Sequence, residues 1–144
     1  MKSDFFTRGS ANKGVKLPLY YPDGTISKDH LTILGIDSDV FRSADASARR
    51  KAIDIAMIKD EAERDEALYQ AKIVLISVLV SEWSFPEPCN AENVAEFLIE
   101  APQLVDQIDE VAASRVEFVK KKQRRSTSTP KQKSPSIKGK KAAS

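Results

Sequence analysis

The longest apolar run in the chain spans residues 73–80 and is interrupted by a single serine. It is too short to cross a bilayer, which takes roughly 20 apolar residues, and periodicity alone does not separate a buried helix from a buried strand. The preceding residues 60–72 are rich in Ala, Glu, Arg, Leu and Gln, which favour helix, and Gly and Pro are absent until Pro86. We therefore predict one helix from about Glu61 to Trp83. Because it is apolar on most sides, other elements must cover it.

A turn signal, Pro22-Asp23-Gly24, separates two short apolar segments near the start of the chain. The pattern around it predicts a β-hairpin with strands near Leu17–Tyr21 and His30–Ile36. Pro18 places the first strand at a sheet edge, since proline cannot donate to a ladder. Two strands alone are marginally stable, so the hairpin has to pack on another element.

Capping residues and apolar spacing predict three more helices. One begins near Ser38 and runs to about Lys59, with an apolar face of Phe41, Ala44, Ala48, Ala52 and Ile55. A short helix follows the cap residue Asn90, with Val94, Phe97 and Leu98 on its apolar side. The last begins at Pro102 and runs to about Phe118. Arg115 lies on the apolar stripe of this last helix, so it should extend to solvent or to a carboxylate.

Charge divides the chain more clearly than its net value of +2 suggests. Residues 120–144 hold ten of the 23 Lys and Arg residues and none of the 21 Asp and Glu residues, which makes this segment +10 and residues 1–119 −8. Such a segment lacks the apolar surface needed to offset the entropy of ordering. We expect a flexible N-terminus (1–14), a β-hairpin plus helical domain (15–119) and a basic disordered tail (120–144). The fold class is mainly α, with about four helices preceded by the hairpin.

Residues for catalysis or metal binding are sparse. His30 is the single histidine and Cys89 the single cysteine, so neither a zinc-ligand set nor an internal disulfide is available, and no Gly-rich phosphate loop occurs. We predict no enzymatic activity, no cofactor and no metal. One cysteine fits a reducing compartment, and residues 1–14 lack the apolar core of a signal peptide.

Two features could serve binding. The basic tail could neutralise phosphates, but it has no aromatic residue for base stacking and the rest of the chain is acidic, so nucleic acid is not the expected main partner. The aromatic residues Trp83, Phe85 and Phe97 either fill the core or anchor a partner. We take these three as candidate partner-binding residues.

Several motifs together resemble the tail assembly chaperones of long-tailed bacteriophages. They are Leu-Val-Ser-Glu-Trp-Ser-Phe at 79–85, Asn-Ala-Glu-Asn-Val at 90–94, Glu-Ala-Pro-Gln-Leu-Val-Asp-Gln-Ile at 100–108, Arg-Val-Glu-Phe at 115–118 and Gly-Ile-Asp-Ser-Asp-Val-Phe-Arg-Ser-Ala at 35–44. The resemblance covers about Gly35 to Phe118. These are packing and capping residues, so they indicate fold more than mechanism.

The resemblance implies a small, non-enzymatic, mostly helical protein of the host cell cytoplasm that is absent from the finished virion. Its partners would be the tape measure protein, which it keeps soluble, and the tail tube protein, which it helps to recruit; self-association stays open, and no membrane is involved. Many such proteins also have a longer form made by programmed ribosomal frameshifting. Two alternatives remain: a small nucleic-acid-associated regulator acting through the basic tail, and a structural component of the head–tail junction.

Overall fold

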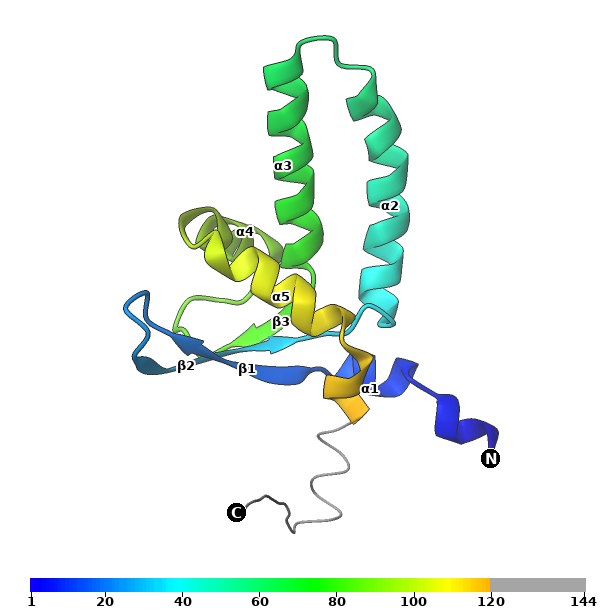
Figure 1. Cartoon of the computed structure of the whole chain (residues 1–144), viewed down its shortest axis with the longest axis vertical. Coiled ribbons are helices and arrows are strands. Elements are labelled where there is room, and N and C mark those ends of the chain that lie inside the picture. Colours follow the sequence, from blue (N-terminus) through cyan, green and yellow to red (C-terminus); the bar gives the residue numbers. More distant parts are fainter. Residues whose placement is uncertain (120–144) are drawn as a thin grey trace, which may run out of the picture.

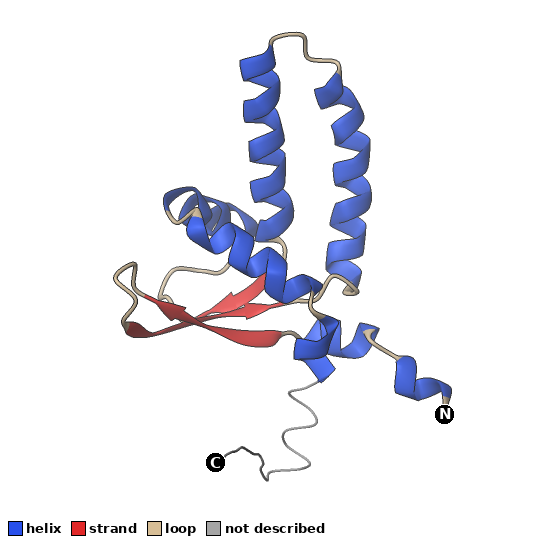
Figure 2. Ribbon diagram, viewed as in Figure 1, coloured by secondary structure: helices blue, strands red, loops and turns tan. Residues whose placement is uncertain are grey.

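A computed structural model describes residues 1–119 as a three-stranded sheet with helices on one side of it. Its elements are a 3₁₀ helix Lys2–Phe5, α1 Arg8–Lys13, β1 Val15–Tyr20, β2 Ile26–Ile33, α2 Asp39–Ala56, α3 Glu61–Ser77, β3 Val80–Trp83, α4 Ala91–Glu100 and α5 Gln103–Ala113. Helices α4 and α5 lie over the sheet, whereas α2 and α3 stand away from it as a long hairpin (Figures 1 and 2). The predicted fold class, mainly helical with an N-terminal β-hairpin, is confirmed. The predicted tail lies outside the described residues.

The β-hairpin forms because its pattern gives one apolar and one polar face. Along β1 buried and exposed residues alternate, and Leu17 lies opposite the fully buried Leu31 of β2. In the turn Gly24 takes a φ of 94°, which favours glycine, and the Asp23 carboxylate accepts hydrogen bonds from Thr25. The second strand begins at Ile26 and ends at Ile33, so its predicted start and end at His30 and Ile36 are both too late.

The prediction of a single helix from Glu61 to Trp83 is wrong beyond Ser77. Helix α3 ends there, and Val80–Trp83 forms β3, which pairs antiparallel with β2 and makes the sheet order β1-β2-β3. A strand satisfies the backbone groups along the free edge of β2, which a longer helix would leave exposed. The reversal is held by a 2.7 Å hydrogen bond from the Leu34 amide to the Leu79 carbonyl.

The core lies between the sheet, the C-terminal end of α3, and helices α4 and α5. Its fully buried side chains are Leu31, Ile33, Ile73, Leu79, Val94, Leu98 and Ile108. In α3, buried residues occur only at Ile73, Ile76 and Ser77, near the end of the helix. The rest of α3 and most of α2 therefore lie beyond the core.

The N-terminal residues form more structure than their polar sequence suggests. Helix α1 buries Ala11 against Gly35, where an added Cβ would lie 2.8 Å from the Ala11 Cβ, and the Gly35 amide donates to the Ala11 carbonyl. This contact requires a residue without a side chain at position 35. The 3₁₀ helix buries nothing, and Phe5 and Phe6 are exposed.

The last predicted helix is divided in two. Helix α5 begins after Pro102, as expected, and ends at Ala113; after Ser114 residues 115–119 form a separate helical turn. The short helix is as predicted at its start, because the Asn90 side chain accepts a 2.8 Å hydrogen bond from the Asn93 amide and α4 follows.

The position of the core predicts where truncation of an apolar side chain is costly. We expect Ile108→Ala to lower the free energy of unfolding by about 2–5 kcal/mol, because Ile108 is fully buried. Ile53→Ala on α2 is the matched control, since Ile53 is 68% exposed and its truncation should change stability by less than about 0.5 kcal/mol. Urea unfolding followed by circular dichroism measures both. A loss at Ile53 as large as that at Ile108 would contradict the assignment of α2 to the region outside the core.

Candidate functional site

The α2–α3 hairpin is the candidate site, because it projects from the sheet and helices that hold the core (Figure 1). Each helix is capped: the Ser38 hydroxyl accepts from the Phe41 amide at 3.3 Å, and the Asp60 carboxylate accepts from the Glu63 amide at 2.8 Å. Both helices therefore begin at defined residues. At its base α2 is also held to α1 by the Arg8–Asp39 ion pair, at 2.7 Å.

A groove with a volume of about 670 Å³ lies between the two helices. Eight of its twelve lining residues are apolar, and four of these are alanines spaced four residues apart on each helix. The lining residues are Ala44, Ser47, Ala48, Lys51, Asp54, Ile55 and Ile58 on the α2 side and Ala67, Gln70, Ala71, Val74 and Leu75 on the α3 side. Residues four apart lie on one helix face, so the alanines of α2 and α3 face the same space. Their small side chains leave that space unfilled.

The hairpin also exposes large apolar side chains. Ile53 is 68% exposed, Met57 77%, Leu68 49%, Tyr69 40% and Val74 59%. Val74 lies in the groove itself. Part of the apolar lining of the groove is therefore accessible to another polypeptide.

The three aromatic residues singled out from the sequence do meet, but beside the core. The ring centroids of Trp83 and Phe85 are 5.2 Å apart, those of Trp83 and Phe97 5.8 Å, and those of Phe85 and Phe97 5.2 Å. All three are half-buried against the core, and the Trp83 Nε1–H donates to the Glu87 carbonyl at 2.7 Å. The cluster therefore holds the 84–90 loop on the domain; a role in partner binding stays a prediction.

The sequence placed Ala44, Ala48 and Ile55 on one apolar helix face but did not show where a groove would lie. They do face inward, toward α3, yet Ala44 and Ala48 are only half-buried. Alanine recurs at four-residue spacing on both helices, at 44 and 48 and at 67 and 71. Alanines on both facing sides suit either close packing of two helices or an open groove, so this pattern alone does not locate the groove.

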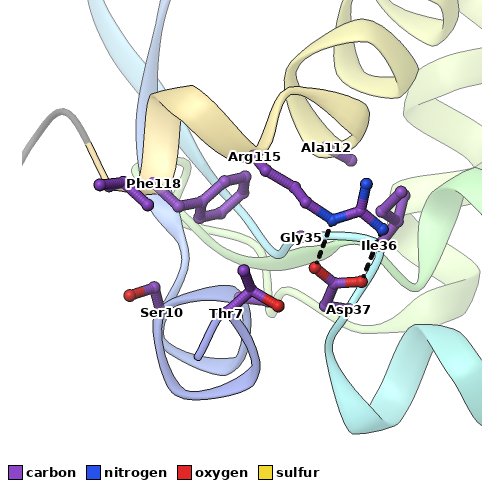
Figure 3. Close-up of a pocket in the computed structure, with 10 residues that line it drawn as sticks. Thr7, Ser10, Gly35, Ile36, Asp37, Ala112, Arg115 and Phe118 are labelled. Atoms are coloured by element: carbon purple, nitrogen blue, oxygen red, sulfur yellow. Dashed lines mark hydrogen bonds and ion pairs between the residues drawn. The ribbon is translucent and has the colours of Figure 1, made fainter. Parts of the chain in front are cut away.

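A second, much smaller hollow lies where the C-terminal turn meets α1 and residues 35–37 (Figure 3). The Arg115 guanidinium donates two hydrogen bonds to the Asp37 carboxylate, at 2.7 and 2.9 Å, so of the two outcomes expected for Arg115, solvent or a carboxylate, the structure shows the carboxylate. The hollow measures about 10 Å³, room for about one water molecule, and buried Phe118 is among its lining residues. We assign a structural role to this contact. The Asp37–Arg115 pair and the buried Phe118 side chain hold residues 115–119 on the domain; we call this pair the clasp.

The Asp37–Arg115 pair changes the pKa of the Asp37 carboxyl group. Hydrogen bonds from Arg115 and then from Thr7 lower the pKa of Asp37 from 3.8 to about 2. Arg115 is largely exposed, with 58% of its side chain accessible, so water screens the pair and reduces its contribution to stability.

The weak candidates for chemistry gain no support in the described residues. The backbone amide of His30 donates a hydrogen bond to the Ser84 hydroxyl. The Cys89 thiol donates to the Val80 carbonyl at 3.7 Å. Burial raises the pKa of the Cys89 thiol, which disfavours the reactive thiolate. Within residues 1–119 no group of three or more His, Cys, Asp or Glu side chains is placed to hold a metal ion, and none of the helices is long and apolar enough to span a bilayer.

Comparisons of the chain with protein-family models, curated proteins and solved structures find no match.

Removing the Asp37 carboxylate should destabilise the protein in a pH-dependent way. We expect Asp37→Asn to lower the free energy of unfolding by about 1 kcal/mol at pH 7, a value reduced for solvent screening. Because the folded-state pKa is lowered, the contribution of Asp37 is fully present above the unfolded pKa of 3.8 and is lost as pH falls toward about 2. The difference between the variant and the native chain should therefore shrink below about pH 4.

The matched control is Asp45→Asn, which breaks the Arg49–Asp45 pair within α2. An i,i+4 surface pair contributes only about 0.3–0.5 kcal/mol. Denaturant unfolding at pH 7, 5 and 3 measures both variants. Equal effects of the two variants, or a constant effect of Asp37→Asn across this pH range, would refute the clasp.

Proposed function

We propose that this protein is a non-enzymatic phage tail assembly chaperone that holds an apolar helix of the tape measure protein in the α2–α3 groove. The observation that carries the proposal is the groove itself, an apolar-lined space between two capped helices that project from the core. A chaperone that retains a partner and later releases it needs such a surface on the folded protein.

The groove suits a helix better than an extended strand. Two helices with facing alanines allow a third backbone to approach closely, and an amphipathic helix laid between them would complete a three-helix bundle. Exposed Val74 and the half-buried Leu75 would then be covered. An unpartnered groove also costs the domain little, because few of the residues of α2 and α3 lie in the core.

The motifs that resemble tail assembly chaperones support the same proposal. Within these motifs Trp83 packs against Phe85, Asn90 caps α4 and Arg115 pairs with Asp37. In this proposal the protein acts in the host cell cytoplasm and is absent from the finished virion. In the same proposal the protein also helps to recruit tail tube subunits.

The alternative of a nucleic-acid-associated regulator has one feature in its favour, the cationic segment 120–144. The described residues oppose it, because they carry a net charge of −8 and would repel phosphates.

Co-expression tests the chaperone proposal. The native chain should raise the soluble fraction of the phage's own tape measure protein severalfold, and Ala48→Trp should abolish this gain by filling the groove. Ala46→Trp is the matched control, because Ala46 is exposed on α2 and is not among the residues lining the groove. Solubility is measured by sedimentation and quantitative blotting. Loss of the effect in both variants, or no gain with the native chain, would count against the proposal, as would the protein's presence in purified virions by mass spectrometry.

The gene offers a further check on the longer product. We expect a slippery heptamer where the codons for Lys120-Lys121-Lys122 or Lys138-Gly139-Lys140-Lys141 lie, followed by an overlapping frame. Sequencing the gene and mass spectrometry of the expressed products decide it. A gene without a heptamer and without that frame removes the idea of a frameshifted form, while the helix-binding proposal would still stand.

A further inference from the structure

The two sides of the α2–α3 groove carry opposite charge. On the α2 side Lys51 lines the groove, and Arg50 donates a 3.1 Å hydrogen bond to the groove residue Ser47; together they outnumber the one acid there, Asp54. We call Arg50, Lys51 and Asp54 the α2 rim. Its net charge is therefore positive.

The α3 side is acidic. Glu66 accepts a 2.8 Å hydrogen bond from the groove residue Gln70, and Glu63 lies one turn before the groove residue Ala67, on the same helix face. Arg64 lies between them and donates a 3.0 Å hydrogen bond to the carbonyl of the groove residue Ile58, so it belongs to this side too. We call Glu63, Arg64 and Glu66 the α3 rim; two acids and one base make its net charge negative. Glu63 and Glu66 are exposed, as are Arg50 and Lys51.

These opposite rims do not pair with each other. Among residues 1–119 the ion pairs that involve α2 or α3 are Arg8–Asp39, Arg49–Asp45 and Lys72–Asp106, and none of them joins α2 to α3. In a closed helical hairpin, facing rows of opposite charge would be within reach of one another. Because no such pair forms among the described residues, the charged groups of each row can pair with a helix placed in the groove.

From this arrangement we propose that the groove selects an amphipathic helix with an acidic row along the flank facing α2 and a basic row along the flank facing α3. The inference rests on the proposed function, because it assumes that the groove holds a helix. It adds the chemistry of that helix and its direction. Turning a helix end for end exchanges its two flanks, so the rims fix which end of the helix lies near the tip of the hairpin.

The occupant is a helix of another polypeptide of this charge pattern. Apolar side chains supply most of its affinity, since eight of the twelve lining residues are apolar. The exposed rim charges add modest energy and determine orientation. A second copy of this chain, which also presents both charge signs, is the competing occupant, and the experiment distinguishes the two.

The probe is a pair of synthetic peptides as long as α3, 17 residues, with the same composition and the same Leu/Ala stripe. In the sided peptide all Glu lie on one flank and all Lys on the other; in the mixed peptide Glu and Lys alternate within each flank. The sided peptide should bind the full native chain about tenfold more tightly by fluorescence anisotropy, the combined effect of three or four weak surface pairs. Equal affinities overturn the proposal.

Rim variants give the sharper readout. Arg50→Glu with Lys51→Glu makes both rims acidic and should remove the preference for the sided peptide. Adding Glu63→Lys and Glu66→Lys exchanges the two rims and should restore it, with the peptide turned end for end. All four positions are exposed and the new residues favour helix, so the fold should be kept, which circular dichroism checks.

Direction is measured by energy transfer between a dye at the peptide's N-terminus and one at the hairpin tip. The tip label is attached through Met57→Cys in a Cys89→Ser background, because Met57 is 77% exposed and Cys89 is the single cysteine. Exchanging the rims should convert high transfer into low transfer or the reverse. Unchanged transfer overturns the proposal.

Analytical ultracentrifugation of the chain alone tests the competing occupant. A monomer at the concentration used for peptide binding supports the proposal. If the chain is a dimer that Arg50→Glu with Lys51→Glu dissociates, the groove binds a second copy of the chain and the proposal is overturned. The two proposals can be overturned separately. If the chain solubilises the tape measure protein but shows no preference between the peptides, the chaperone proposal is kept and the proposed charge pattern is overturned. If it prefers the sided peptide but does not solubilise the tape measure protein, the charge pattern is kept and the chaperone proposal is overturned.

Discussion

Pairing of β3 with β2 is the interaction on which the rest of this structure depends. It makes the apolar run turn back at Ser77, so that only the last turns of α3 enter the core with Ile73 and Ile76. Had α3 continued to Trp83, the free edge of β2 would have been left without partners for its backbone groups. The same turn leaves the first part of α3, and α2 beside it, outside the core.

A projecting pair of helices is stable only if its ends are held and its exposed apolar surface is tolerated. Here Ser38 and Asp60 cap the two helices, Arg8 holds the start of α2, and the base of α3 is in the core. The facing alanines leave the space between the two helices unfilled. The residues that stabilise the domain and the residues that line the groove are therefore mostly different ones.

The opposite end of the molecule is arranged differently. The Asp37–Arg115 clasp and buried Phe118 hold residues 115–119 against α1 and Gly35, and the chain leaves the domain from there (Figure 3). The groove and the Asp37–Arg115 pair therefore lie at opposite ends of the described part of the chain (Figure 1).

The sequence by itself determined the local features: the hairpin turn at Pro22-Asp23-Gly24, the caps at Ser38 and Asn90, and the start of α5 after Pro102. Each of these depends on residues that lie close together in the chain. Only the tertiary structure decided that Val80–Trp83 is a strand, because a short apolar run satisfies either period and the free edge of β2 is distant in sequence. It likewise decided that the facing alanines border an open groove, since that follows from the separation of two helices that no third element of the domain fills.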